Sequence, residues 1–380
     1  MTDTTSTSTA AAADNNNPTI TANTITTKDD DAPVFWKLDT NNGIKPTYWD
    51  DYIATRPPYD SKIFDPIISY QTAHLPPPPP PPSSSKNDSS HEKTTTALDI
   101  GTGAGSALTP LTKHFHHVIA TDNDPASLAY AKSRFASVHG DKVSFVLSSG
   151  EDLRSHFPPG SIDLITCAET FPLMDTSAAL DNIHALLKPG GTLAVWFYGP
   201  PFFVEPEFAS ACQPLLDQLL DTNFGSVING FGEARSLSWK RAADGMASWL
   251  DYIPLNDPGK WQDVRRHKWN NSFTRLSWFT DAACDFQVER VSAVGPDETV
   301  TEEQDTGFWP REWDFEMLRR FVNASFPRPR ANGQERDEVD DKMDVLFDEL
   351  AQAMGGHGAK RKLSWPAVLV LASKKGQGYG

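Results

Sequence analysis

The sequence predicts an α/β fold, built on a mainly parallel sheet with helices on both faces. Short apolar runs alternate with helix-like segments between Thr96 and Tyr198, and such alternation is typical of parallel strands joined by crossover helices. The first apolar run, 97–100, leads into a segment with glycines at three alternate positions. A glycine turn between a strand and a helix lets the backbone approach a ligand closely, so this turn indicates a nucleoside-binding unit.

Five strands and their helices are expected in order along this part of the chain. The expected strands are 97–100, 117–121, 143–147, 162–167 and 192–198, and the expected helices are 106–115, 124–138, a short one after Glu151, and 176–187. The segment Lys188-Pro189-Gly190-Gly191 predicts the end of the last helix and a turn, because proline and glycine are typical of helix ends.

The flanking regions depart from this alternation. Residues 1–31 lack apolar periodicity and predict a disordered tail, and the seven prolines of 76–82 predict a polyproline II loop. There an inert insertion is favoured over a docking site for an SH3-like or profilin-like partner. The expected division is 1–31, a tail; 32–74, an N-terminal segment; 75–96, a Pro/Ser-rich loop; 97–200, the core; 201–275, a helical region; 276–294, a helix and a sixth strand at Phe286–Val291; 295–362, a helical insertion; and 363–380, a last strand and tail.

Composition limits the function. The formal net charge is −16, from 34 basic and 50 acidic residues, which disfavours a nucleic-acid partner. Neither a secretory signal nor an apolar stretch long enough for a membrane is recognisable, and the three cysteines favour a reducing compartment. We therefore expect a cytoplasmic protein without a membrane partner. The basic cluster at 265–268 is interpreted as a solvated helix face, and the histidines show no metal-ligand spacing.

The glycine turn carries the most specific signal. Asp99 precedes glycines at 101, 103 and 105, whereas a dinucleotide fingerprint would need glycine at Ser106. This pattern resembles class I S-adenosylmethionine (SAM) methyltransferases. Because SAM carries no pyrophosphate, the loop need only pass its amino-acid tail, and a carboxylate such as Asp99 complements its ammonium group. A tight turn without a ligand is the alternative.

The next two strands end in further candidates for the cofactor site. Asp122 ends the second strand at about the 20-residue offset where an acidic residue meets ribose hydroxyls. Its alternative role is a helix N-cap, for which Asp124 is better placed because Pro125 follows it. After the third strand, Ser149-Gly150-Glu151 could contact adenine or simply cap a helix.

Three residues at or just after the end of the fourth strand lie where open α/β folds bind ligands. Cys167 is interpreted as a small residue at the cofactor site rather than a nucleophile, since no activating partner is recognisable. Glu169 could border the methyl-transfer channel, and Phe171 is a candidate substrate wall although such residues are more often core.

The chain as a whole resembles the fungal group similar to trans-aconitate methyltransferase. The resemblance rests on 48–59, on 98–122 and on Leu187-Lys188-Pro189-Gly190-Gly191-Thr192 with the closing 363–366. It implies a Rossmann-like sheet of seven strands with an antiparallel last strand, under a helical cap. It also implies that 32–74 folds over the cofactor as a lid, with Tyr52, Arg56 and Tyr59 as candidates. Where relatives often have a His-Trp pair, this chain has Phe171-Pro172-Leu173-Met174.

These observations predict methyl transfer from SAM to an oxygen of a small molecule. The expected cofactor residues are Asp99, Gly101, Thr102, Gly103, Gly105, Asp122, Asn123, Gly150, Glu151 and Cys167. A carboxylate acceptor would be held by arginine, with Arg56, Arg235, Arg275 and Arg311 as candidates, and a hydroxyl acceptor would need a base such as Glu169. Two alternatives remain: a protein that binds SAM without transferring methyl, and a nicotinamide-dependent oxidoreductase.

Overall fold

The computed structural model describes residues 48–75, 95–228, 233–272, 280, 282–326, 328 and 336–376 of the 380-residue chain. The chain divides into two units, 1–33 and 34–380, and every described residue belongs to the second. The predicted tail at 1–31 and the prolines of 76–82 lie outside the described residues. Among the described helices, none combines the length and the apolar character needed to cross a bilayer.

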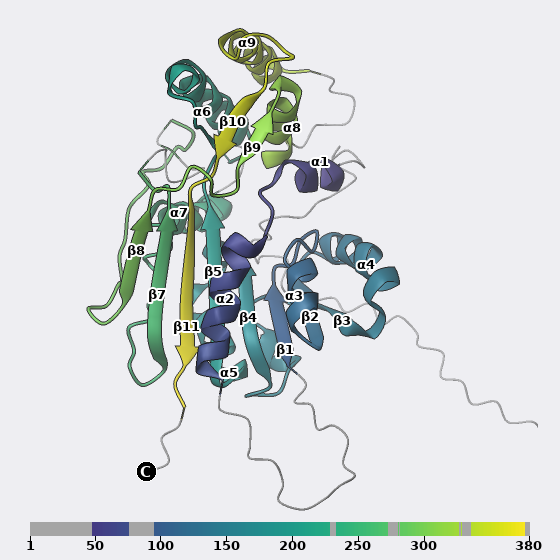
Figure 1. The fold of residues 1–380 in the computed structure, drawn as a ribbon, viewed down its shortest axis with the longest axis vertical. Helices are drawn as coiled ribbons and strands as arrows, with labels where there is room; N and C mark the ends of the chain where they lie inside the picture. The colour runs from purple at the N-terminus through teal and green to yellow at the C-terminus, as the bar shows by residue number, and fades with distance from the viewer. Residues whose placement is uncertain are drawn as a thin grey trace, which may run out of the picture. The chain divides into compact units, whose positions relative to one another are not determined.

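An eight-stranded sheet forms the centre of the described unit (Figure 1). Its order is β3 (Val143–Leu147), β2 (His117–Asp122), β1 (Thr96–Ile100), β4 (Ile162–Ala168), β5 (Leu187–Tyr198), β11 (Ala367–Lys374), β7 (Trp261–Trp269) and β8 (Thr299–Glu303). Strands β1 to β5 are parallel, whereas β11 runs antiparallel to both β5 and β7. The predicted α/β fold with an antiparallel last strand is confirmed, but the sheet has more strands than seven.

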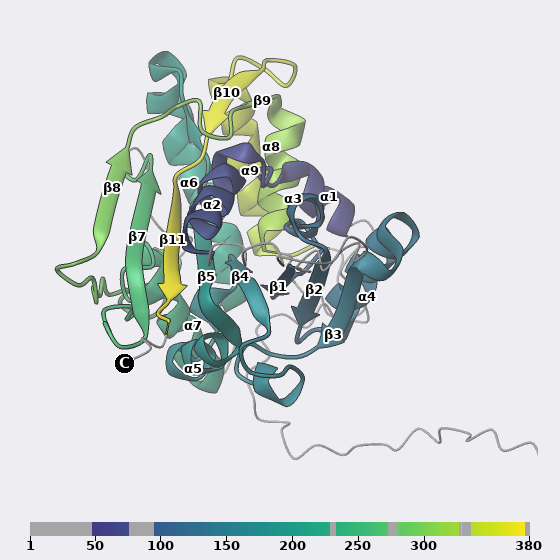
Figure 2. The same ribbon diagram turned by 60° about the horizontal axis from the view of Figure 1, so that its bottom comes forward.

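Helices cover the sheet on both sides (Figures 1 and 2). Helix α2 (Ser61–His74) crosses one face over β5 and β11, and α7 (Glu233–Ala247) lies behind the other face. The crossover helices are α3 (Leu108–His114), α4 (Pro125–His139) and α5 (Thr176–Leu186), joined by the 3₁₀ turns η2 (Gly140–Lys142), η3 (Leu153–Ser155) and η4 (Phe171–Leu173). These bounds agree with the expected helices to within two residues at each end, apart from the short turns.

The sixth strand lies elsewhere than predicted. Residues 286–291 form no strand, and β7 takes that place beside β11, inside the region expected to be mostly helical. The interpretation of 265–268 as a solvated helix face was wrong, because side chains on a strand alternate between its faces. Arg266 and Lys268 point inward and are buried, and their charges are paired with Glu298 (2.6 Å) and Asp251 (2.7 Å).

The expected turn at 188–191 is part of β5 instead. The pairing of β4 with β5 changes register between Ile162 and Leu164, which accommodates Pro189 and the two glycines. A Cβ atom on Gly191 would lie 2.8 Å from the carbonyl oxygen of Lys188. Glycine is therefore required there by close backbone packing.

A cap of helices and a small sheet stands over the carboxyl edge of the main sheet (Figure 1). It consists of α6 (Pro206–Ile228), α8 (Phe315–Ser325), α9 (Glu338–Ala353) and the antiparallel strands β6 (Phe202–Phe203), β10 (Arg361–Ser364) and β9 (Arg311–Trp313). The expected helical insertion at 295–362 thus contains α8 and α9, together with short strands. Helix α1 (Tyr48–Thr55) packs against α8.

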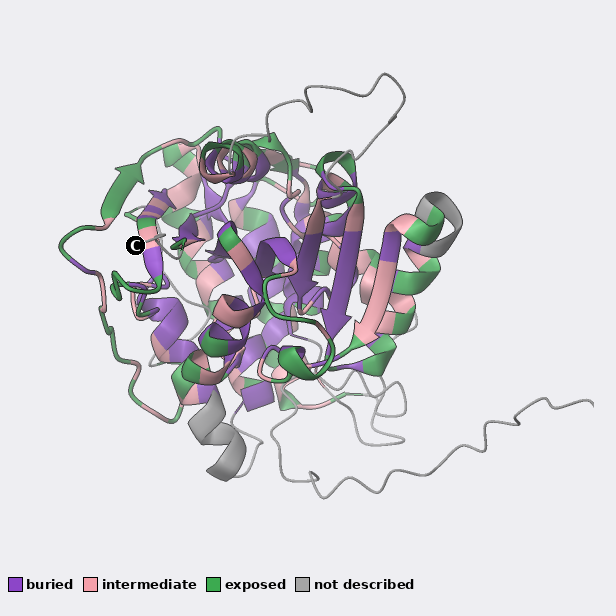
Figure 3. Cartoon of the chain, turned by 90° about the horizontal axis from the view of Figure 1, so that it is seen from below, coloured by how far each residue is buried: buried purple, intermediate pink, exposed green. Residues whose placement is uncertain are grey.

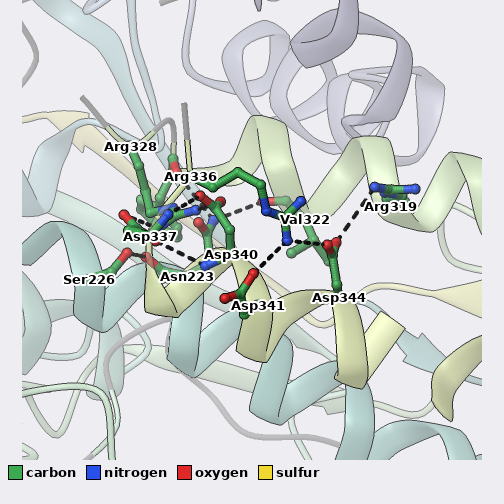
Figure 4. Close-up of polar contacts among 11 residues, drawn as sticks. Asn223, Ser226, Arg319, Val322, Arg328, Arg336, Asp337, Asp340, Asp341 and Asp344 are labelled. Atoms are coloured by element: carbon green, nitrogen blue, oxygen red, sulfur yellow. Dashed lines mark hydrogen bonds and ion pairs between the residues drawn. The ribbon is translucent and has the colours of Figure 1, made fainter. Parts of the chain in front are cut away.

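Side-chain hydrogen bonds hold the cap helices together (Figure 4). Asn223 of α6 donates to the carbonyl oxygens of Val322 (3.0 Å) and Phe326 (3.2 Å) at the end of α8. At the start of α9, Asp337 forms a capping box with Asp340, and Arg328 pairs with both carboxylates. These contacts join α6 to α8 and fix Arg328 at the start of α9. In the main sheet, burial is concentrated in the central strands (Figure 3).

Candidate functional site

The glycine turn lies at the carboxyl edge of the sheet, between β1 and α3. Gly101, Gly103 and Gly105 have φ angles of 66°, 51° and 81°, in the left-handed region that favours glycine. A Cβ atom on Gly101 would lie 2.4 Å from the side chain of Thr170, which follows β4. The loop after β4 therefore closes directly against the glycine turn, and a larger residue would push the two loops apart.

Asp99 is a buried carboxyl beside this turn, with an exposed fraction of 1%. Its Oδ1 accepts a hydrogen bond of 2.7 Å from the hydroxyl of Thr166 in β4. Burial raises the pKa of Asp99 to about 6, against the opposing effect of the Thr166 and Thr102 hydroxyls, and the nearby Asp122 raises it further. None of these neighbours in the described part of the chain is a cation.

Asp122 ties the glycine turn to the end of β2. Its Oδ2 accepts from the backbone N–H of Gly103 (2.8 Å), and its Oδ1 accepts from that of Asp124 (2.9 Å). Burial raises the pKa of Asp122, and these two hydrogen bonds oppose the shift. Asp124 caps α4 through the N–H of Ser127 (2.9 Å), as expected, whereas the contact of Asp122 with ribose stays a prediction. Asn123, between the two aspartates, is exposed.

The loop after β3 is used largely for structure. The Glu151 carboxylate accepts from the backbone N–H of Asp175 (2.8 Å), the N-cap residue of α5, so its side chain helps to fix the start of that helix. Gly150 is buried, and a Cβ atom there would lie 2.5 Å from Met174 Sδ. Contact with adenine through this loop stays a prediction.

Two of the expected residues near β4 are fully buried. Burial and the neighbouring Asp99 raise the pKa of the Cys167 thiol well above its ordinary value, so it stays neutral. Phe171 is the first residue of η4 and is also fully buried. Their proposed cofactor and substrate contacts therefore stay predictions, and packing accounts for both side chains.

Glu169 has an unusual backbone at the end of β4. Its φ is 64°, rare for a residue with a side chain, and its N–H donates to the carbonyl oxygen of Trp196 (2.9 Å). Its Oε1 accepts from the backbone N–H of Tyr198 (2.6 Å). Burial raises the pKa of Glu169 well above its usual range, although the Tyr198 N–H and the Arg56 charge act against this shift.

Arg56 and several tyrosines face Glu169 from the N-terminal segment. The Arg56 guanidinium carbon lies 4.6 Å from the centre of the Tyr52 ring and 5.5 Å from that of Phe321. Burial raises the pKa of Tyr52, while Arg56 lowers it and Glu169 raises it. The structure thus brings together the predicted Tyr52, Arg56 and Glu169.

The predicted Tyr59 completes this group within an aromatic enclosure that the sequence analysis missed. Its ring centre lies 5.2 Å from that of Trp196, 6.2 Å from that of Trp309 and 6.5 Å from that of Tyr198. Trp196 and Tyr198 end β5, and the carboxyl ends of parallel strands meet at one edge, so their place could have been inferred. Trp309 is one of seven tryptophans between 239 and 313, of which the sequence suggests that a few line an apolar pocket, but no local pattern distinguishes it from the others.

Helix α1 bridges the glycine turn and the cap. Trp49 stacks on Tyr130 of α4 with ring centres 5.5 Å apart, and it lies 3.9 Å from the position of a Cβ on Gly103. On the other side, Asp51 pairs with Arg320 of α8 at 2.7 Å. Helix α1 thus lies beside the glycine turn, and its role as a lid over the cofactor stays a prediction.

Of the other three candidate arginines, Arg311 is the one whose side chain the structure describes. Arg311 lies in β9, where burial lowers its pKa and the nearby Asp60 raises it. The Arg235 side chain and all of Arg275 lie outside the described residues. A groove of about 740 Å³ runs between α5 and α7, lined by Thr176, Arg241, Tyr252 and Lys260 among others, and no residue of the glycine turn lines it.

Comparison with known proteins extends these observations. A family model described as a methyltransferase domain matches residues 98–195. Methyltransferase pgmE of Aspergillus terreus is 40% identical over 347 residues, covering 90% of this chain and 97% of the relative. Methyltransferase ptaI of Pestalotiopsis fici is 35% identical, covering 88% and 94%. Methyltransferase cfoB of Aspergillus candidus is 32% identical, covering 86% and 94%.

Proposed function

The chain belongs to the class I SAM-dependent methyltransferases, and from this premise we propose that it methylates an oxygen atom of a small molecule. Of the two acceptor atoms that the sequence suggests, we favour a carboxylate over a hydroxyl. When bound, SAM supplies an activated methyl group. What the chain's own residues must do is hold that cofactor, orient the acceptor in line with it, and keep water out.

One observation carries the cofactor site: a buried carboxyl, Asp99, stands beside three left-handed glycines without a cation among its described neighbours. A buried carboxylate is costly unless a positive group joins it, and the ammonium group of SAM fits this need. We propose that Asp122 accepts from the ribose hydroxyls, since carboxylate oxygens have lone pairs beyond the two that Gly103 and Asp124 use. Thr102 and Asn123, which neighbour these residues in the sequence, complete the proposed cofactor site on this side.

The charge balance on the acceptor side favours an anionic acceptor. The raised pKa of Glu169 favours its neutral form, so the charge of this group of residues is the positive charge of Arg56. A guanidinium holds a carboxylate through two parallel hydrogen bonds, and the rings of Tyr52 and Phe321 fix its plane. A carboxylate needs no base, whereas a hydroxyl acceptor would require Glu169 to take up its proton.

The same proposal places the reaction in the reducing cytoplasm and assigns it a soluble small-molecule acceptor. It is supported by the three cysteines, which are all free thiols. The enclosure of Tyr59, Trp196, Trp309 and Tyr198 supports an acceptor with an apolar body, because aromatic walls around a few polar groups are usual in small-molecule sites.

The test combines binding and turnover. Calorimetry with SAM and S-adenosylhomocysteine should show binding, which Asp122→Ala should weaken. Turnover with methyl-labelled SAM over matched carboxylic acids and alcohols should yield a labelled ester, which mild alkali hydrolyses, and not an alkali-stable ether. Arg56→Gln should reduce turnover without abolishing SAM binding. Ether products would reject the carboxylate acceptor, and binding without any turnover would favour a SAM-binding protein that transfers no methyl.

A further inference from the structure

A buried hydroxyl in β4 contacts the Asp99 carboxylate. Thr166 is fully buried and is the register partner of Asp99 across the β1–β4 pair. Its hydroxyl donates to Asp99 Oδ1 at 2.7 Å. A hydrogen bond donated to an ionised oxygen is stronger than one between neutral groups, so this contact favours the ionised carboxyl over the protonated one.

We propose that Thr166 is a positioning residue for cofactor binding, which keeps the Asp99 carboxylate ionised and aimed at the ammonium group of SAM. Thr166 acts through Asp99 and need not touch the cofactor. The inference rests on the proposed function in one respect, namely that Asp99 is the partner of that ammonium group.

The surroundings of Asp99 explain why such help is needed. Burial pushes the pKa of Asp99 up to about 6, and the negative charge of Asp122 acts in the same direction. Cys167, the next residue of β4, is held neutral by burial and by Asp99. The hydroxyls of Thr166 and Thr102 are the groups that lower this pKa. Without Thr166, more of the Asp99 population would carry a proton near neutral pH and would no longer attract a cation.

The chain offers a matched control on the other side of β1. Thr121 of β2 is also fully buried, and its hydroxyl donates to the backbone carbonyl oxygen of Asp99 at 3.1 Å. Valine has nearly the same size and shape as threonine, so replacing either threonine by valine removes one buried hydroxyl and changes little else. Only the change at Thr166 removes a hydrogen bond to the carboxylate itself.

The experiment measures S-adenosylhomocysteine affinity by calorimetry between pH 5 and pH 7.5 for the wild type and four variants. Thr166→Val should move the pH midpoint of binding upward by about one unit and weaken binding at pH 6 roughly fivefold. Thr166→Ser should restore the wild-type midpoint, and Thr121→Val should not move it. As a second probe, 5′-methylthioadenosine lacks the amino-acid tail, so its affinity should not respond to Thr166→Val.

The remaining variant, Asp99→Asn, separates the two ideas. If it loses affinity while Thr166→Val keeps the wild-type midpoint, the role of Thr166 is wrong and the cofactor site stands. If Asp99→Asn binds as the wild type does, the proposed cofactor site itself is wrong. Thermal denaturation reports whether each variant folds, and Thr166→Ala replaces the valine variant if valine prevents folding.

Discussion

Two buried charges of this chain are stabilised in opposite ways. Arg266 in β7 is fully buried, pairs with Glu298 at 2.6 Å, and donates to the carbonyl oxygens of Leu250 (2.7 Å) and Ile253 (2.9 Å). Asp99 in β1 is as deeply buried but receives only hydroxyl contacts from its described neighbours. The first charge is neutralised within the chain, so it holds loops to the sheet. The second is left for a ligand to neutralise.

This difference separates a structural polar cluster from a functional one. A strongly shifted pKa in a cleft points to function only when the chain itself does not supply the compensating group. For Arg266 the compensating group is the carboxylate of Glu298. This carboxylate is 3% exposed, and it also accepts from the N–H of Gly295 at 3.0 Å. Asp99 combines burial with a shifted pKa and a neighbouring glycine turn.

The largest effect is expected from breaking the self-neutralised pair. Glu298→Gln leaves the buried Arg266 guanidinium without a counter-charge, which should lower the free energy of unfolding by about 3–5 kcal/mol. Urea denaturation measures this loss. The control is Glu302→Gln on the exposed strand β8, where a change within about 0.5 kcal/mol is expected. Equal losses in both variants would remove the distinction between the two kinds of charge.

The carboxyl of Asp99, which has no counter-charge among its described neighbours, should make the stability of the protein depend on pH. The pKa of Asp99 rises from 3.8 to about 6 on folding, so the folded state binds its proton more tightly than the unfolded chain does. Without cofactor, the wild type should therefore gain stability relative to Asp99→Asn as the pH falls from 7 to 4, by up to about 3 kcal/mol. Thermal denaturation of both proteins across this range measures the gain. A constant difference would show that Asp99 has an ordinary pKa.

The glycine turn offers a paired test of packing against conformation. Gly101 and Gly160 have nearly the same φ, 66° and 64°. A Cβ atom on Gly101 would clash with Thr170, whereas a Cβ atom on Gly160 would have no other atom within 4 Å. Gly160→Ala should cost about 1 kcal/mol from its backbone alone. Gly101→Ala should cost about 1–2 kcal/mol more and should weaken SAM binding. Similar unfolding free energies for both variants would mean that Thr170 moves aside freely.

The smallest effect is expected at the contact between α1 and the cap. Asp51 and Arg320 form a partly exposed ion pair between α1 and α8, and such pairs contribute at most about 1 kcal/mol. Asp51→Asn should therefore change the unfolding free energy little, and high salt should abolish the difference. A double-mutant cycle with Arg320→Gln measures the coupling. Coupling well above 1 kcal/mol would make this contact between α1 and α8 comparable to the buried pair of β7.

Local patterns were sufficient for the nucleotide-binding half of the fold. Strand β3 begins and ends at the predicted residues, and Asp124 caps α4 as its neighbour Pro125 suggests. Each of these features depends on residues a few positions apart. The trio of Tyr52, Arg56 and Glu169 came instead from the family resemblance together with the position of β4, because nothing local connects α1 with that strand.

The region after β5 could not be predicted in the same way. Strand β7 contains Arg265-Arg266-His267-Lys268, a sequence that belongs in a buried sheet only because Glu298 and Asp251 lie opposite. Asp251 is 17 residues from Lys268 and Glu298 is 32 residues from Arg266, and no periodicity in the sequence predicts either pairing. The left-handed backbone of Glu169 was missed for a related reason, since its hydrogen bonds go to Trp196 and Tyr198 of the next strand.

The outermost strand of the sheet has a consequence for the protein in concentrated solution. All five residues of β8 are exposed, and its outer edge is the last in the described sheet. The backbone N–H and C=O groups at an open edge can pair with the same strand of a second molecule, and repeated pairing leads to aggregates. Glu302 and Glu303 bring repelling carboxylates to that edge in a chain of net charge −16. Acidification, which removes those charges, should therefore promote self-association.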